Sequence, residues 1–190
     1  MPNEDPQRTW KPYNERKKKA EQVSEAVKLS ASAVQVATAP QDFSDWESLL
    51  ELLRTSFAYM DSRIDPPSSL QKMGIDELRS KAQQENLILA TDGSELIGCA
   101  FAAVRNDCVY IGKIAVAERA RGRGVARQLI AAAESIATTA GRQALELQTR
   151  VELVENHKTF AALGFEKVTE TAHPGYTRPT SITMRKAIGP

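Results

Sequence analysis

The 190-residue sequence has little cysteine, no long apolar run and no apolar N-terminal segment. Two cysteines, Cys99 and Cys108, are too few for a disulfide framework or a cysteine-based metal cluster, and we expect reduced thiols. No apolar run approaches the roughly 20 residues that a membrane-spanning helix needs. The N-terminus lacks the apolar core of a secretory signal. These absences predict a cytoplasmic protein without a membrane segment or a metal.

Net charge is also small, at +1, so nothing in the overall balance points to nucleic acid or a membrane surface. The chain is 42% hydrophobic and 26% charged, which is typical of a globular domain. Residues 1–33 differ from the rest because they are charged and have few large apolar side chains. We predict a helical or flexible extension there, with a helix near residues 15–30, and a folded domain over residues 34–190. Contact between the basic cluster at residues 16–19 and an acidic partner is the alternative to a solvated arm.

The remaining sequence alternates between patterns typical of strands and of amphipathic helices. Phe43, Trp46, Leu50, Leu53 and Phe57 follow each other at steps of three and four, as on one helix face. Asp42 or Ser44 is the expected cap of this helix. The fold class predicted is α/β (α+β), with a mixed, mostly antiparallel sheet and helices on both faces. The strands are expected over 34–38, 87–91, 96–104, 108–116, 144–149, 165–170 and 180–186, and the helices over 42–57, 75–86, 125–137 and 153–163.

The segment AERARGRG, residues 117–124, joins a predicted strand to a predicted helix. Gly122 and Gly124 allow a tight turn in which successive amides point at one position. The helix N-terminus adds unpaired donors and partial positive charge, and Arg119, Arg121 and Arg123 add full charges. This combination predicts a site for a pyrophosphate-like anion. The alternative is a connecting loop with solvated arginines.

Two nucleotide-binding motifs do not fit this segment. The P-loop pattern is absent, and a dinucleotide fingerprint would need a third glycine where Arg127 stands. The segment instead resembles the R/Q-x-x-G-x-G/A signature of the GCN5-related N-acetyltransferases (GNAT). The later segment ENHKTFAALGF, residues 155–165, resembles the Asn…Leu-Gly-Phe segment of the same family.

The resemblance implies a GNAT fold and acetyl-CoA as co-substrate. It implies that one strand pairs with the pantetheine arm, that the amides of residues 121–126 bind the pyrophosphate, and that two helix residues lie near the sulfur. The implied acetyl-CoA residues are Ile114, Ala115, Val116, Arg119, Arg121, Gly122, Arg123, Gly124, Val125, Ala126, Asn156 and Phe160. Many GNAT enzymes have a proton-donating tyrosine where this chain has Phe160. Tyr59 and Tyr176 are candidates to replace it.

Direct acetyl transfer requires a neutral amine. A lysine-like amine with a pKa of about 10.4 lies roughly 3.4 units above pH 7, a deficit of about 4.6 kcal/mol. A base must therefore take the proton. The candidates are Glu146, Asp61, Asp65, His157, His173 and Tyr176, with Glu146 placed in the catalytic set beside Tyr59 and Tyr176.

The acceptor pocket is expected between residues 57–70 and 173–180. Arg63 and Arg178 are candidates to bind a carboxylate, and Asp61 and Asp65 to attract an ammonium group. We therefore predict a small amine or amino acid as acceptor, and acetyl-CoA as partner, with nucleic acid disfavoured and a homodimer left open. A protein N-acetyltransferase and a non-catalytic acyl-CoA-binding regulatory module are the alternatives.

Overall fold

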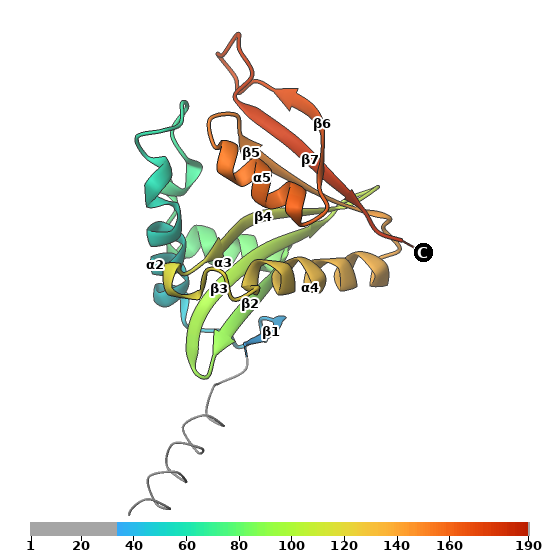
Figure 1. The fold of residues 1–190 in the computed structure, drawn as a ribbon. Helices are drawn as coiled ribbons and strands as arrows, with labels where there is room; N and C mark the ends of the chain where they lie inside the picture. The colour runs from blue at the N-terminus through green and yellow to red at the C-terminus, as the bar shows by residue number, and fades with distance from the viewer. Residues whose placement is uncertain (1–33, 190) are drawn as a thin grey trace, which may run out of the picture. The chain divides into compact units, whose positions relative to one another are not determined.

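The computed structural model describes residues 34–189 (Figure 1). The predicted extension over residues 1–33, with its helix and basic cluster, lies outside the described residues. The described part forms one compact unit. None of its helices is long and apolar enough to cross a membrane.

Seven strands form one sheet in the order β1-β2-β3-β4-β5-β7-β6 (Figure 1). All neighbouring strands are antiparallel except β4 and β5, which are parallel. The prediction of a mixed, mostly antiparallel sheet is therefore confirmed. The strands are β1 (Gln35–Thr38), β2 (Asn86–Asp92), β3 (Glu95–Val104), β4 (Val109–Val116), β5 (Ala144–Arg150), β6 (Glu166–Thr171) and β7 (Ser181–Ala187).

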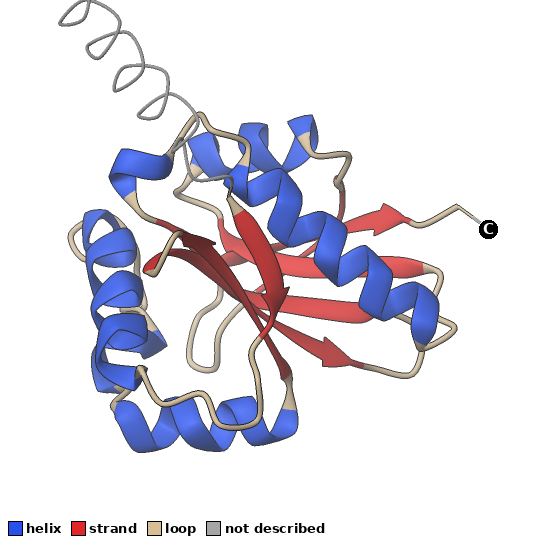
Figure 2. Cartoon of the chain, turned by 90° about the horizontal axis from the view of Figure 1, so that it is seen from below, coloured by secondary structure: helices blue, strands red, loops and turns tan. Residues whose placement is uncertain are grey.

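Helices cover both faces of this sheet (Figure 2). Helix α4 packs on β1 to β5, and α2 packs on β3, β4 and α3. Because both faces are covered, β3 is buried without interruption from Ile97 to Ala102. The helices are α2 (Trp46–Phe57), α3 (Ile75–Gln84), α4 (Val125–Thr139) and α5 (Val154–Ala162), with 3-10 turns η1 (Ala58–Met60), η2 (Ser69–Lys72) and η3 (Glu118–Ala120).

Helix α2 begins later than its sequence pattern predicts. Its N-cap is Asp45, whose side chain accepts a hydrogen bond of 3.3 Å from the amide of Ser48. The expectation of Asp42 or Ser44 as cap was therefore wrong, because Asp45 satisfies the exposed amide at the actual first turn. Leu49 and Leu53 are fully buried, so the amphipathic pattern itself is confirmed.

The two cysteines are free thiols, as the sequence predicted, and both are buried. Cys99 lies on β3 opposite Ala115 of β4, and its thiol contacts the carbonyl of Lys113 at 3.7 Å. Burial raises the pKa of the Cys99 thiol to about 12. It is therefore an unreactive core residue in the folded chain.

Candidate functional site

Strands β4 and β5 pair only over a short stretch and then separate. Pairing runs from Val109 opposite Leu145 to Ile111 opposite Leu147 and stops there. Directly beyond it, the register of β4 against β3 shifts, and Lys113 adopts a positive φ of 51°. Such a bulge bends a strand, so the edge of β4 from Gly112 to Val116 has no β5 partner.

A cleft of about 1650 Å³ occupies this region. Residues of β4, of β5, of the loop before α4, of the segment between α2 and α3, and of α5 line it. Ten of the twelve predicted acetyl-CoA residues line it: Ile114, Ala115, Val116, Arg121, Gly122, Gly124, Val125, Ala126, Asn156 and Phe160. The structure thus brings most of the predicted set together.

The loop before α4 presents backbone amides at the cleft. Gly122 and Gly124 have φ values of 76° and 78°, which other residues rarely adopt. No backbone hydrogen bond of the described residues is donated by the amides of Gly122, Gly124, Val125 or Ala126. Those of Arg121 and Arg123 instead donate within the loop, to Glu118 and Ala120 at 3.1 and 3.4 Å. Four amides are therefore available, fewer than predicted.

The arginines of this loop fall into two groups. Arg119 forms an ion pair with Glu95, and Arg123 forms one of 2.7 Å with Asp92, so both contact the turn between β2 and β3. Neither lines the cleft, whereas Arg121 and Arg127 do. The expectation that Arg119 and Arg123 face the anion is corrected accordingly, because carboxylates distant in sequence hold their guanidinium groups.

On α5, Asn156 and Phe160 face the cleft from the side opposite β4. The Asn156 amide contacts the hydroxyl of Tyr59, which accepts a hydrogen bond of 2.9 Å from Nδ2. Tyr59 also lines the cleft, whereas Tyr176, the other candidate for the missing tyrosine, does not. The Phe160 ring packs edge-on against Phe165, with centroids 6.1 Å apart.

Glu146 does not line the cleft. Its carboxylate lies 3.1 Å from Arg105 and 3.8 Å from Arg185. Both of its carboxylate oxygens are thus ion-pair partners of arginines outside the cleft. The structure therefore does not support its selection as the base.

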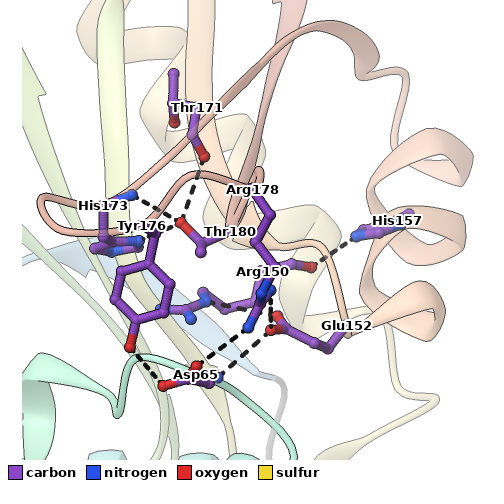
Figure 3. A network of polar contacts seen from close by, with 9 residues as sticks. All are labelled: Asp65, Arg150, Glu152, His157, Thr171, His173, Tyr176, Arg178 and Thr180. Atoms are coloured by element: carbon purple, nitrogen blue, oxygen red, sulfur yellow. Dashed lines mark hydrogen bonds and ion pairs between the residues drawn. The ribbon is translucent and has the colours of Figure 1, made fainter.

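Tyr176, Asp65 and Arg178 belong to a polar network beside the cleft (Figure 3). The Tyr176 hydroxyl donates to Asp65 at 2.5 Å, and this hydrogen bond raises the pKa of the tyrosine. Arg178 contacts Asp65 at 3.2 Å and Glu152 at 3.6 Å. None of these four residues lines the cleft. Tyr176, Asp65 and Arg178 were expected to serve catalysis or the acceptor, and they bind each other instead.

The other two predicted acceptor residues are also engaged outside the cleft lining. Arg63 forms a bidentate contact with Glu155, at 2.5 and 3.0 Å, and its guanidinium lies 5.7 Å from the Tyr59 ring centroid. The Arg63 hydrogen bond holds the pKa of Glu155 below its ordinary value. Asp61 accepts a hydrogen bond of 3.1 Å from Gln71. The Arg63–Glu155 contact joins α5 to the segment after α2, and the Asp61–Gln71 contact lies within that segment.

Of the two histidines, only His173 lines the cleft. Its Nδ1 lies 2.6 Å from Thr180 Oγ1, and its backbone amide donates to the same oxygen at 2.9 Å. His157 contacts the carbonyl of Arg150 at 2.8 Å instead. The structure thus distinguishes two residues that the sequence left as equal candidates.

Five cationic residues that line the cleft were not predicted as site residues from the sequence: Lys72, Lys81, Lys113, Arg127 and Arg150. Burial, followed by repulsion from Lys81, lowers the pKa of Lys113, and its ammonium group donates to Ser69 at 3.0 Å. Arg150 is the last residue of β5 and directly follows the strand predicted over residues 144–149. This position was the feature of the sequence that could have identified it as a site residue. No group of metal-ligating side chains occurs among the described residues.

A family model described as "Acetyltransferase (GNAT) family" matches residues 46–165. The chain belongs to this family. Membership confirms the fold class and the acyltransferase activity that the sequence motifs predicted. No curated protein sequence matches the chain significantly.

Solved GNAT structures resemble the chain at low identity. The ribosomal-protein-S18-alanine N-acetyltransferase of Escherichia coli is 17% identical with a TM-score of 0.60, over 82% of this chain and 94% of that one. A GNAT acetyltransferase of Elizabethkingia anophelis with acetyl-CoA bound is 17% identical with a TM-score of 0.59, over 82% and 98%. The PaiA N-acetyltransferase of Thermoplasma acidophilum in complex with coenzyme A is 16% identical with a TM-score of 0.67, over 82% and 99%. These similarities establish the shared fold.

Proposed function

We propose that this GNAT protein transfers the acetyl group of acetyl-CoA directly to the amine of a small, amino acid-like acceptor. The observation that carries the proposal is the separation of β4 from β5 beside four amides without backbone partners at the start of α4. The acetyl-CoA and coenzyme A complexes of similar structures support the choice of co-substrate. A cytoplasmic location, which the two free cysteines support, is part of the same proposal.

The residues present fit the parts of acetyl-CoA. The amides of Gly122, Gly124, Val125 and Ala126 and the N-terminal partial charge of α4 suit a pyrophosphate. A Cβ built on either glycine would meet no atom within 4 Å, so the space above the loop is open. The β4 edge over residues 114–116 suits the pantetheine amides, which would extend the sheet like an added strand.

Proton removal from the amine is assigned to His173. In the tautomer with the proton on Nδ1, this nitrogen would donate to Thr180 Oγ1, 2.6 Å away, and that hydroxyl would donate to the Thr171 carbonyl at 3.4 Å. This chain of contacts fixes the ring and leaves Nε2 as the proton acceptor. Nε2 would take the proton from the amine as the new C–N bond forms.

Proton delivery to the leaving sulfur is assigned to Tyr59. Asn156 Nδ2 donates to the phenol oxygen at 2.9 Å, which stabilises the phenolate left after proton transfer. Tyr59 would thereby replace the tyrosine whose family position holds Phe160. The CoA thiolate, whose thiol has a pKa of about 8.5, is an adequate leaving group even without protonation by Tyr59.

Free thiol released from acetyl-CoA, measured over a panel of amino acids and amines, tests the proposal. We expect acetyl-CoA-dependent turnover with at least one amine. Calorimetric binding of acetyl-CoA without turnover on any panel member would contradict it and favour the non-catalytic regulatory module.

A further inference from the structure

Arg150 is a buried cation in the wall of the cleft. The residue is 9% exposed, and it follows the point where β5 has left β4. Its carbonyl accepts hydrogen bonds from the Leu153 amide at 3.2 Å and from His157 Nε2 at 2.8 Å. These two hydrogen bonds fix the backbone at the end of β5.

The guanidinium lacks the hydrogen bonds that its burial requires. Nε and Nη2 are buried without a hydrogen-bond acceptor among the described residues. The carboxylate of Glu152 is an ion-pair partner 3.7 Å from Nε, which is too far for a hydrogen bond (Figure 3). Glu152 is also shared with Arg178, at 3.6 Å. A buried charged donor without an acceptor costs free energy, so an additional anion here would be stabilising.

The charge of the cleft points to the same kind of ligand. Its lining includes six cationic residues and one carboxylate, Glu155, which Arg63 already binds. Arg121 and Arg127 lie at the pyrophosphate end. The remaining four are Lys72, Lys81, Lys113 and Arg150. A polycationic acceptor would be repelled by this surface, whereas a zwitterionic one would not.

Apolar side chains line the same cleft as Arg150. Met60, Ile64 and Leu153 form a buried cluster with Phe57 packed against it, and all four line the cleft. Leu153 is tied to Arg150 through the backbone hydrogen bond given above. An acceptor bound here would meet a cation and an apolar wall together.

We propose that Arg150 binds the carboxylate of the acceptor, and that the acceptor class is therefore α-amino acids with an apolar side chain. Two donors of the guanidinium would form a bidentate contact with the carboxylate, and the apolar cluster would contact the side chain. This assignment rests on the proposed acetyltransferase function. It replaces Arg63 and Arg178, which are engaged elsewhere.

The test compares leucine with 3-methylbutylamine, the same molecule without its carboxylate, and phenylalanine with phenethylamine. The wild type and Arg150→Gln are assayed for kcat/KM by thiol release. We expect Arg150→Gln to lose at least tenfold with the amino acids, mainly in KM, and to stay within about threefold with the amines. Acetyl-CoA affinity and melting temperature, measured in parallel, establish that the variant is folded.

Arg178→Gln is the matched control, because Arg178 contacts Glu152 but does not line the cleft. It should keep the wild-type preference, and Arg150→Lys should fall between wild type and Arg150→Gln. Equal losses for amino acids and amines in Arg150→Gln would overturn the assignment. So would an amino acid-specific loss of the same size in Arg178→Gln.

If the wild type acetylates no panel member, the proposed function fails, and the subsite is tested by binding alone. Calorimetry with coenzyme A present would compare N-acetylleucine with N-acetyl-3-methylbutylamine. Tighter binding of N-acetylleucine that disappears in Arg150→Gln would sustain the carboxylate subsite. Equal binding of the two compounds, or no binding of either, would overturn it.

Discussion

Gly124 has a backbone conformation that the start of α4 requires and that a side chain disfavours. Its φ is 78°, and an added Cβ would point into the open space of the cleft. We expect Gly124→Val to weaken acetyl-CoA binding at least tenfold, about 1.4 kcal/mol, because the side chain both displaces the amides and obstructs the anion. Calorimetric affinity and melting temperature measured together give the result.

Gly141→Val is the matched control for strain. Gly141 follows the other end of α4, has a φ of 65° and also faces open space. The two variants should lose similar stability, roughly 1–2 kcal/mol for a side chain in this region, but only Gly124→Val should lose affinity. Unchanged affinity in a folded Gly124→Val protein would contradict the anion site.

His173 and Glu146 were both candidate bases in the sequence, of which Glu146 was placed in the catalytic set, and they occupy different environments in the structure. His173→Gln removes the proton acceptor that lines the cleft, so we expect kcat to fall by about 10²–10⁴. Glu146→Gln removes a carboxylate held by Arg105 and Arg185, and kcat should stay within about twofold. The opposite order of effects would restore Glu146 as the base.

At the scale of elements, the segment after α2 is joined to β5 and to the loop before β7 through Glu152. Burial raises the pKa of this carboxyl, but hydrogen bonds from its own amide and that of Asp65, together with Arg150 and Arg178, outweigh burial and hold it below 4.5. A lowered folded-state pKa means that the unfolded chain binds the proton more readily. The contact therefore stabilises the fold fully above pH 4.5 and is lost as the pH falls through the folded-state value.

Glu152→Gln should consequently lower the melting temperature at pH 7 by more than at pH 4. The exposed Glu166 on β6 provides the control, Glu166→Gln, with little change at either pH. A melting-temperature difference for Glu152→Gln that is independent of pH would show that the carboxylate charge is not what stabilises these contacts.

The elements themselves were largely predictable, because each depends on local periodicity. The apolar steps of α2 and the strand patterns of β2 and β3 identified them without any tertiary information. The acceptor end was not predictable in this way. Arg63 pairs with Glu155 and Arg178 with Asp65, residues 92 and 113 positions apart, and no local pattern encodes such contacts. Arg150 was missed for the same reason, since no local pattern encodes its burial.

At the scale of the whole molecule, the described residues 34–189 belong to a compact unit of their own. All cleft residues lie within it. We therefore expect a truncated chain beginning at Val34 to remain folded and to bind acetyl-CoA with unchanged affinity. Thermal unfolding and calorimetry of the two proteins provide the comparison, and loss of most stability or binding on truncation would show that residues 1–33 complete the fold or the site.

Burial of Cys99 makes this thiol a chemical reporter of sheet opening. With a pKa of about 12, and with β4 covering it, it should react with iodoacetamide only when β3 and β4 separate. In a Cys108→Ser background, the alkylation rate then follows the population of open molecules.

A ligand that binds only the closed sheet, at a concentration of a hundred times its Kd, should slow alkylation about 100-fold. Mass spectrometry of alkylated protein would thus rank acetyl-CoA, coenzyme A and candidate acceptors by affinity without any enzymatic turnover, and equal rates with and without acetyl-CoA would show that the β4 edge is not where it binds.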